Sequence, residues 1–264
     1  MTTVTLRPLA MGEILDQAFG LFRRKFGALL TISVVCSGLP ALLNVLVRAR
    51  GGLILAWGLG LTAMVLGVIG GAVATGASTY VVSGAYLNHE VSATQALERA
   101  LPRLWQLILC SFGFGLLVGL GMLLLFVPGV IALSGCVLCF TAVVVERLDA
   151  QAALGRSWEL TRGFRWRMLG LLFVFGVVLY VPMLAVGVVV GMMGGLDPAA
   201  IRAVQMGGTV TAGFLFVSVV TAVVQIVLSP FLYCILVTAY YDLRVRKEAF
   251  DLELLAGSLA PAGA

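Results

Sequence analysis

Long apolar stretches separated by short polar ones dominate the pattern of the chain. Two of them, 26–47 and 168–193, each match the roughly 20 apolar residues that one membrane-spanning helix needs. Two others, 53–88 and 206–241, have about 36 residues each, and the middle one, 104–146, is longer still. Apolar runs of this length predict a chain that crosses a lipid bilayer several times.

The three long stretches decide the number of crossings. Pro128-Gly129 is a turn signal inside the middle stretch, which is too long for one crossing, so we predict a hairpin of two spans there. As a helix, each 36-residue stretch extends about 54 Å, too long for one perpendicular crossing and short for two. We assign one crossing to each and attribute the excess length to tilt and outward extension. The predicted fold class is therefore an all-α membrane protein with six transmembrane helices.

The distribution of Lys and Arg supports this assignment. Six spans place the N-terminus, the loops 89–103 and 147–167, and the C-terminus on one side, together with 14 of the 17 basic residues. The other side holds Arg48, Arg50 and Arg202. By the positive-inside rule both termini are expected in the cytoplasm, which predicts a multi-pass protein of the bacterial cytoplasmic (inner) membrane.

Three of the expected cytoplasmic segments share an amphipathic helical pattern and each leads straight into an odd-numbered span. Their apolar faces are Met11, Ile14, Leu15, Ala18, Phe19 and Phe22, then Leu97, Ala100, Leu101, Leu104, Trp105 and Ile108, then Leu154, Ser157, Trp158, Thr161 and Phe164. We predict three interfacial helices. The single integral domain 1–264 then divides into tandem helix-span-span repeats, 11–88, 95–146 and 151–241, with a cytoplasmic tail 242–264. Chance similarity among membrane hairpins is the alternative.

Composition excludes other classes of protein. Hydrophobic residues make up 61% of the chain and charged residues only 11%, whereas a soluble domain carries about 25% charged residues. Eleven of the 12 acidic residues share the expected cytoplasmic side with the basic ones, so no dense basic patch for nucleic acid is predicted. The five cysteines lie in apolar runs, and Cys136-x-x-Cys139 has no second pair for zinc. We expect packing cysteines and no cofactor.

Three motifs, in this order along nearly the whole chain, carry a resemblance to a known family. They are Leu6-Arg7-Pro8-Leu9 with Gly12-Glu13-Ile14-Leu15-Asp16-Gln17-Ala18-Phe19 and Phe26-Gly27, then Ala153-Leu154 with Arg156-Ser157-Trp158-Glu159-Leu160-Thr161-Arg162-Gly163, then Ser229-Pro230-Phe231 with Tyr240-Tyr241-Asp242-Leu243-Arg244-Val245-Arg246-Lys247-Glu248 and Phe250-Asp251-Leu252. The chain resembles the bacterial polytopic family labelled glycerophosphoryl diester phosphodiesterase membrane domain-containing.

The resemblance implies a membrane location. The enzymes behind the label carry a separate catalytic barrel, a fold of about 250 residues, with histidines and carboxylates that hold a metal. This chain has one histidine, His89, next to Glu90. We therefore predict no enzymatic activity. An embedded phosphodiesterase would need His89, Glu90, Glu98 and Glu146 to lie together.

Polar residues inside the spans are the candidates for cavity lining. Gln225, Thr221 and Ser218 lie three, four and seven positions apart, so they share one face of a helix, and Asn44 lies near the outer end of the first span. None of them titrates, which argues against a proton relay. Hydrogen bonding between helices is the alternative explanation of the same pattern.

Basic and aromatic residues at the expected cytoplasmic face are candidates for contact with lipid headgroups or a partner protein, with simple interfacial anchoring as the alternative. They are Trp158, Arg162, Arg165, Trp166, Arg167, Arg244, Arg246 and Lys247. The pairs Gly67/Gly71, Gly115/Gly119 and Gly187/Gly191 are spaced for close helix contact in a compact bundle or a homo-oligomer.

The leading functional hypothesis is a non-enzymatic membrane protein that organises envelope components or binds another membrane or cytoplasmic protein. The alternative is a transporter or a lipid or small-solute permease, which predicts a polar cavity near mid-membrane that contains Gln225.

Overall fold

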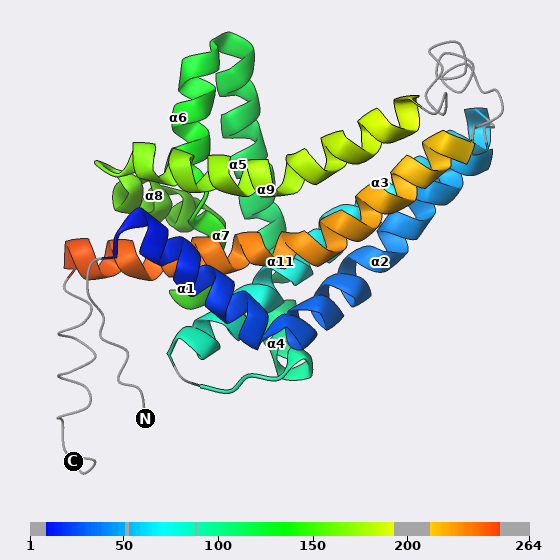
Figure 1. The fold of residues 1–264 in the computed structure, drawn as a ribbon. Coiled ribbons are helices and arrows are strands. Elements are labelled where there is room, and N and C mark those ends of the chain that lie inside the picture. Colours follow the sequence, from blue (N-terminus) through cyan, green and yellow to red (C-terminus); the bar gives the residue numbers. More distant parts are fainter. Residues whose placement is uncertain (1–8, 51–52, 88, 193–211, 249–264) are drawn as a thin grey trace.

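A computed structural model describes residues 9–50, 53–87, 89–192 and 212–248 (Figure 1). Every regular element in these ranges is helical. The elements are α1 (Met11–Arg24), α2 (Phe26–Arg50), α3 (Leu53–Tyr86), α4 (Ala93–Ala100), the 3-10 turn η1 (Leu101–Arg103), α5 (Leu104–Leu124), α6 (Phe126–Cys136), α7 (Cys139–Val145), α8 (Ala150–Thr161), α9 (Arg165–Met192) and α11 (Ala212–Glu248).

The described residues contain six helical segments that are long and apolar enough to cross a membrane. They are Phe26–Leu46, Gly58–Tyr86, Ala93–Leu124, Phe126–Val145, Arg165–Met192 and Leu215–Glu248. The predicted all-α fold with six spans is therefore confirmed. Each 36-residue stretch contributes one continuous helix, α3 with 34 residues and α11 with 37.

The hairpin in the middle stretch turns earlier than the Pro-Gly signal predicted. The backbone is extended at Leu125, between α5 and α6, and Pro128 and Gly129 lie in the first turn of α6. Proline is tolerated there because the first turn of a helix does not use its backbone N–H groups. Gly129 serves close packing instead: a Cβ added to Gly121 of α5 would lie 2.7 Å from the Gly129 Cα.

The helix of the fourth span is interrupted between α6 and α7, which we did not predict. Ser157 of α8 bridges it, donating its hydroxyl to the Gly135 carbonyl at 2.8 Å and accepting the Leu138 N–H at 3.2 Å. Thr161 donates to the same carbonyl at 3.0 Å. Helix α8 thus supplies the hydrogen bonds that the interrupted helix lacks, and its docking on α5, α6 and α7 was not evident from its amphipathic pattern.

The order short helix, span, span occurs three times in the described residues, as α1-α2-α3, α4-α5-α6/α7 and α8-α9-α11. That these units are true repeats stays a prediction. The second short helix runs straight into its span as predicted, because α4, η1 and α5 follow one another without a gap. Lys25 and the segment 162–164 separate the other two short helices from α2 and α9. In the last case Gly163 has φ +90°, a conformation that favours glycine.

Side-chain contacts join the segments expected on the cytoplasmic side. Lys25, after α1, lies 3.6 Å from the Glu90 carboxylate. Arg103 donates to the Arg147 carbonyl at 3.1 Å. Figure 1 shows α1 beside the C-terminal part of α11, and much of the buried core lies at this end of the bundle.

Away from this end, α2, α3 and α11 run together while the hairpin α5–α6 points in another direction (Figure 1). Helices α2 and α3 approach most closely at Gly70, where an added Cβ would lie 2.1 Å from the Cys36 carbonyl oxygen. The residue in close contact is therefore Gly70, and not Gly67 or Gly71 as the spacing predicted. This pair of helices forms one wall of the candidate site.

Candidate functional site

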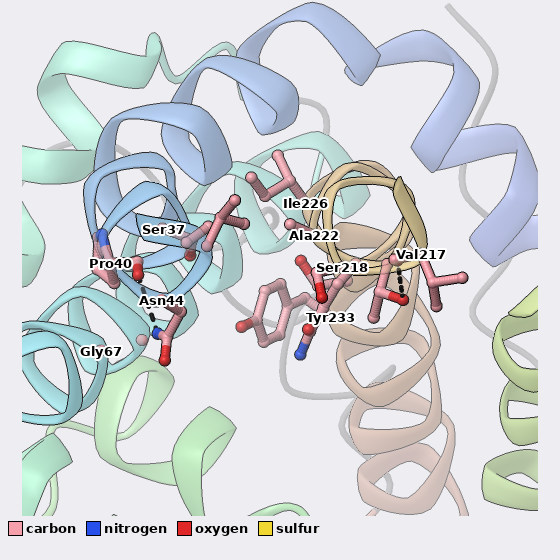
Figure 2. A pocket seen from close by; sticks show the side chains of 15 residues that line it. Ser37, Pro40, Asn44, Gly67, Val217, Ser218, Ala222, Ile226 and Tyr233 are labelled. Atoms are coloured by element: carbon pink, nitrogen blue, oxygen red, sulfur yellow. Dashed lines mark hydrogen bonds between the residues drawn. The ribbon is translucent and has the colours of Figure 1, made fainter. Parts of the chain in front are cut away.

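A cavity of about 490 Å3 lies between α2, α3 and α11 (Figure 2). Its lining is mostly small, hydroxylated or amide-bearing: Ser37, Pro40, Ala41, Asn44, Val45, Gly67, Gly71, Val217, Ser218, Thr221, Ala222, Gln225, Ile226, Ser229 and Tyr233. The four residues proposed from the sequence as cavity lining, Gln225, Thr221, Ser218 and Asn44, are all among them. The structure thus brings these residues together, and their role in binding stays a prediction.

One face of α11 supplies the polar wall of the cavity. Ser218, Thr221, Gln225 and Ser229 follow one another at three- and four-residue steps, which places them along one side of a helix. From Val217 to Tyr233 the wall extends about 24 Å at the helical rise. The cavity is therefore long and narrow.

Several lining groups already form hydrogen bonds within the protein. Thr221 donates its hydroxyl to the Val217 carbonyl at 2.7 Å, and the Asn44 amide donates to the Pro40 carbonyl at 2.9 Å. At the Tyr233 end of the cavity, here called its deep end, the Thr75 and Tyr233 hydroxyls are hydrogen-bonded at 3.1 Å. Within the described part of the chain the Gln225 amide has no hydrogen-bond partner.

Glycine creates the room for this cavity. A Cβ added to Gly71 would meet no atom within 4 Å, and one added to Gly67 would only reach Pro40 at 4.0 Å. Three other glycines predicted to lie at helix contacts, Gly115, Gly119 and Gly187, also have no atom within 4 Å of an added Cβ. The glycine pair in α3 therefore lines a space instead of a helix-helix contact.

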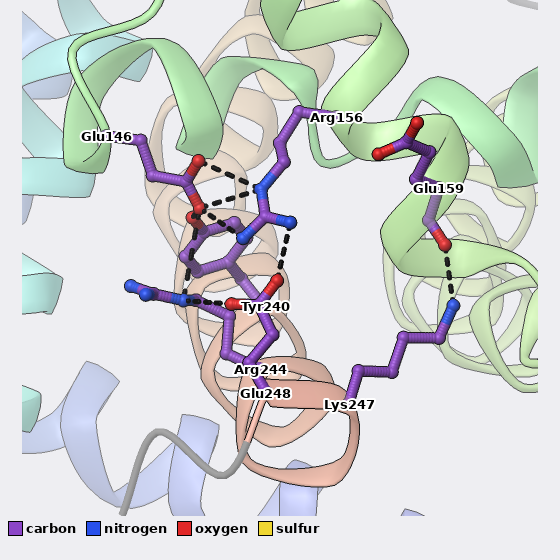
Figure 3. Close-up of polar contacts among 7 residues, drawn as sticks. All are labelled: Glu146, Arg156, Glu159, Tyr240, Arg244, Lys247 and Glu248. Atoms are coloured by element: carbon purple, nitrogen blue, oxygen red, sulfur yellow. Dashed lines mark hydrogen bonds and ion pairs between the residues drawn. The ribbon is translucent and has the colours of Figure 1, made fainter. Parts of the chain in front are cut away.

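A second polar cluster lies at the end of the bundle expected to face the cytoplasm (Figure 3). Glu146, which follows α7, accepts hydrogen bonds from Arg156 Nε at 2.9 Å and from the Tyr240 hydroxyl. Arg156 also contacts Glu248 at 2.5 Å, and Arg244 contacts Glu248 at 3.0 Å. Hydrogen bonds to Glu248 and Glu146 raise the pKa of the Arg156 guanidinium, so this cation is held in its charged form.

Asp242 forms a neighbouring cluster that joins the two ends of the described chain. Its side chain is 1% exposed and accepts the Leu9 N–H at 2.7 Å. Arg246 and Arg167 lie 3.0 and 3.2 Å from the Asp242 carboxylate. Both guanidinium groups also donate to the Leu9 carbonyl.

Three residues predicted to contact headgroups instead form ion pairs within these clusters. Arg167, Arg244 and Arg246 are bonded to carboxylates within the protein, so their guanidinium groups have a structural role. Arg244 and Arg246 pair with Glu248 and Asp242 four residues away on α11, a spacing visible in the sequence. Arg167 pairs with Asp242 from a distant segment, which local sequence does not predict. Lys247 is exposed, and its ammonium donates to the Glu159 carbonyl.

The remaining predicted residues lie at the surface. Trp166 is 86% exposed and Arg162 is also exposed. Trp158 packs over Gly135 on one side, and the Arg165 guanidinium lies 4.0 Å from the centre of its ring. Contact of these residues with headgroups or a partner stays a prediction.

The residues that a phosphodiesterase would need do not form a metal site. The Glu146 carboxylate accepts hydrogen bonds from Arg156 and Tyr240, and the Glu90 carboxylate pairs with Lys25. In the described ranges, no group of three His, Cys, Asp or Glu side chains is placed to hold a metal ion. All five cysteines are free thiols.

Comparison with known proteins gives one match. No curated protein and no solved structure matches the chain. A family described as a domain of unknown function (DUF7847) matches residues 40–243, more than three quarters of the chain, including α3 and most of α11. The resemblance to the glycerophosphoryl diester phosphodiesterase membrane region stays a prediction. The chain belongs to the family defined by this domain of unknown function, DUF7847.

Proposed function

We propose that the protein is a permease for a lipid or a small solute and that the cavity between α2, α3 and α11 is its binding site. The observation that carries the proposal is Gln225, whose amide lines this cavity without a hydrogen-bond partner among the described residues. An unpaired amide in hydrocarbon costs several kcal/mol. Water or a ligand in the cavity removes that cost, whereas a dry bundle would not.

The depth of Gln225 supports the same proposal. It lies ten residues after Leu215, where the sixth span begins, and 23 residues before Glu248, where the span ends, so it is well inside the span. Secondary transporters bind their substrates near the bilayer midplane, often beside helices of irregular shape.

We further propose that the protein resides in the bacterial cytoplasmic membrane with both termini in the cytoplasm. The excess of Lys and Arg in the four segments on this side supports that orientation. The contacts Lys25–Glu90 and Leu9–Asp242, which bring these segments to one end of the bundle, support it as well. The cavity then occupies the outer half of the bilayer and its middle.

Native mass spectrometry of the full chain purified from bacterial membranes tests the binding site. We expect wild-type protein to retain a small molecule or lipid, and Ala222→Trp, which fills the cavity, to lose it. Val219→Trp is the matched control, because Val219 is exposed on α11 but does not line the cavity. Retention of the same compound by Ala222→Trp, or no bound compound in the wild type, would contradict the proposal.

Reconstitution tests transport. Vesicles that contain wild-type protein should move the compound identified by mass spectrometry across the bilayer, and vesicles with Ala222→Trp should not. Equal movement in protein-free vesicles would rule out a permease.

A second candidate is the non-enzymatic partner-binding role, and the exposure of Trp166 favours it. A tryptophan that is 86% exposed beside the exposed Arg162 is a surface on which another membrane or cytoplasmic protein can dock. Cross-linking in native membranes should yield a defined partner that Trp166→Ala loses and Trp105→Ala, which changes another exposed tryptophan, retains. A partner pattern unchanged by Trp166→Ala would reject this candidate.

A further inference from the structure

We infer that the ligand of the cavity between α2, α3 and α11 is a slender, uncharged amphiphile with a hydroxyl-bearing head. The inference rests on the proposed function, since it assumes that this cavity binds a ligand. It is carried by the shape of the cavity, by the absence of charge from its lining, and by the hydrogen-bonding groups that remain available there.

The dimensions of the cavity favour a slender occupant. A volume of about 490 Å3 along a wall of about 24 Å leaves a mean cross-section of roughly 20 Å2. An α-helix with its side chains has a diameter of about 10–12 Å, so a single extended chain matches these dimensions better than a partner helix or a helix of a second copy.

The lining excludes a charged ligand. None of the lining residues is Asp, Glu, Lys or Arg. A phosphate or an ammonium group in this part of the bilayer would lose its hydration without gaining an opposite charge, which is costly. The charged side chains of this protein are instead concentrated in the Glu146 and Asp242 clusters, which lie beyond the deep end of the cavity.

The available polar groups match a hydroxyl. The Gln225 amide has an oxygen that accepts and N–H groups that donate. A ligand hydroxyl can donate to the amide oxygen and accept from an amide N–H. At the deep end, Tyr233 is held by Thr75 and keeps capacity for a second hydrogen bond. Val45, Val217 and Ile226 add apolar surface along the same cavity, which suits the hydrocarbon part of an amphiphile.

Two probes with the same acyl chain test this inference on the full chain in nanodiscs. Monooleoylglycerol is uncharged and has two hydroxyls, and oleoyl lysophosphatidic acid replaces one of them with a phosphate. By native mass spectrometry we expect monooleoylglycerol to bind at least tenfold more tightly. This comparison uses wild-type protein alone, so it does not depend on the folding of a variant.

Variants locate the bound probe. Gln225→Met removes the amide at similar volume and should weaken monooleoylglycerol binding about tenfold, whereas Val223→Leu, on a different face of α11, should leave it unchanged. Equal or tighter binding of the phosphate probe, or binding of neither probe, overturns the inference. The proposed function fails separately, if Ala222→Trp retains the compound that copurifies with wild-type protein.

Discussion

The backbone N–H of Leu9 donates a 2.7 Å hydrogen bond to the Asp242 carboxylate, joining residues 233 positions apart. Asp242 lies near the end of α11, the same helix that supplies Gln225 to the cavity. The N-terminal segment therefore holds the helix that forms the polar wall of the candidate site. Four predictions concern the contacts that set the positions of these helices.

Loss of the Asp242 charge should destabilise the protein. Asp242→Asn leaves Arg167 and Arg246, whose side chains are 17% and 24% exposed, without their carboxylate. Because these guanidinium groups are partly solvated, we expect a loss of about 2–3 kcal/mol, less than for a fully buried pair. Thermal unfolding in detergent should show a lower midpoint, while Asp16→Asn, at an exposed position of α1, should have little effect. Equal midpoints would show that the cluster adds nothing.

Glu146 and Arg156 should be energetically coupled. Their side chains are 18% and 23% exposed and are bonded through two guanidinium nitrogens. A double-mutant cycle with Glu146→Gln and Arg156→Gln should give a coupling of about 1–3 kcal/mol in unfolding experiments. The same cycle for Lys25 and Glu90 should give a much smaller coupling energy, because the Glu90 side chain is 96% exposed. Additive effects at Glu146 and Arg156 would contradict this prediction.

Two adjacent glycines of α3 should respond in opposite ways to alanine. Gly70→Ala would place a Cβ 2.1 Å from the Cys36 carbonyl oxygen and force α2 and α3 apart, at a cost of about 2 kcal/mol or more. Gly71→Ala meets no atom within 4 Å and should be neutral or stabilise the helix by up to about 1 kcal/mol. Thermal unfolding of the two variants in one detergent provides the comparison. A similar response would place the closest approach of α2 and α3 elsewhere.

Ser157 should stabilise the interrupted fourth span. Ser157→Ala leaves the buried Leu138 N–H without the hydroxyl that accepts it, at a cost of about 1–3 kcal/mol. Ser111→Ala is the control, because the Ser111 hydroxyl bonds only the Leu107 carbonyl one turn earlier in the same helix. Hydrogen exchange at α6 and α7 should accelerate in Ser157→Ala only. Unchanged exchange would mean that the break is stabilised by packing alone.

Hydropathy and periodicity were sufficient to predict the spans and the polar face of α11. The six spans are visible in the sequence because hydrocarbon requires long apolar helices. The three-, four- and seven-residue spacing of Ser218, Thr221 and Gln225 places them on one face whatever the helix packs against, so their shared position at the cavity was predictable.

The contacts that depend on tertiary structure were not predictable. Arg167 meets the Asp242 carboxylate from a distant segment, and both Arg167 and Arg246 also donate to the Leu9 carbonyl near the other end of the chain. The i,i+4 spacing of Asp242 and Arg246 was visible in the sequence, but these long-range contacts were not. The break after α6 lies in an apolar run with no proline at that point, and only the docking of Ser157 from α8 shows how its backbone groups are satisfied.

The central claim is that Gln225 faces a polar intramembrane cavity, and thiol labelling tests it most directly. Small, uncharged and water-soluble methanethiosulfonate reagents react with thiolates, which form where water has access. We predict that Gln225→Cys reacts and that Val223→Cys, which does not line the cavity, stays inert, after subtraction of the wild-type signal from the five native cysteines. An inert cysteine at position 225, or equal reaction at both positions, would contradict the account.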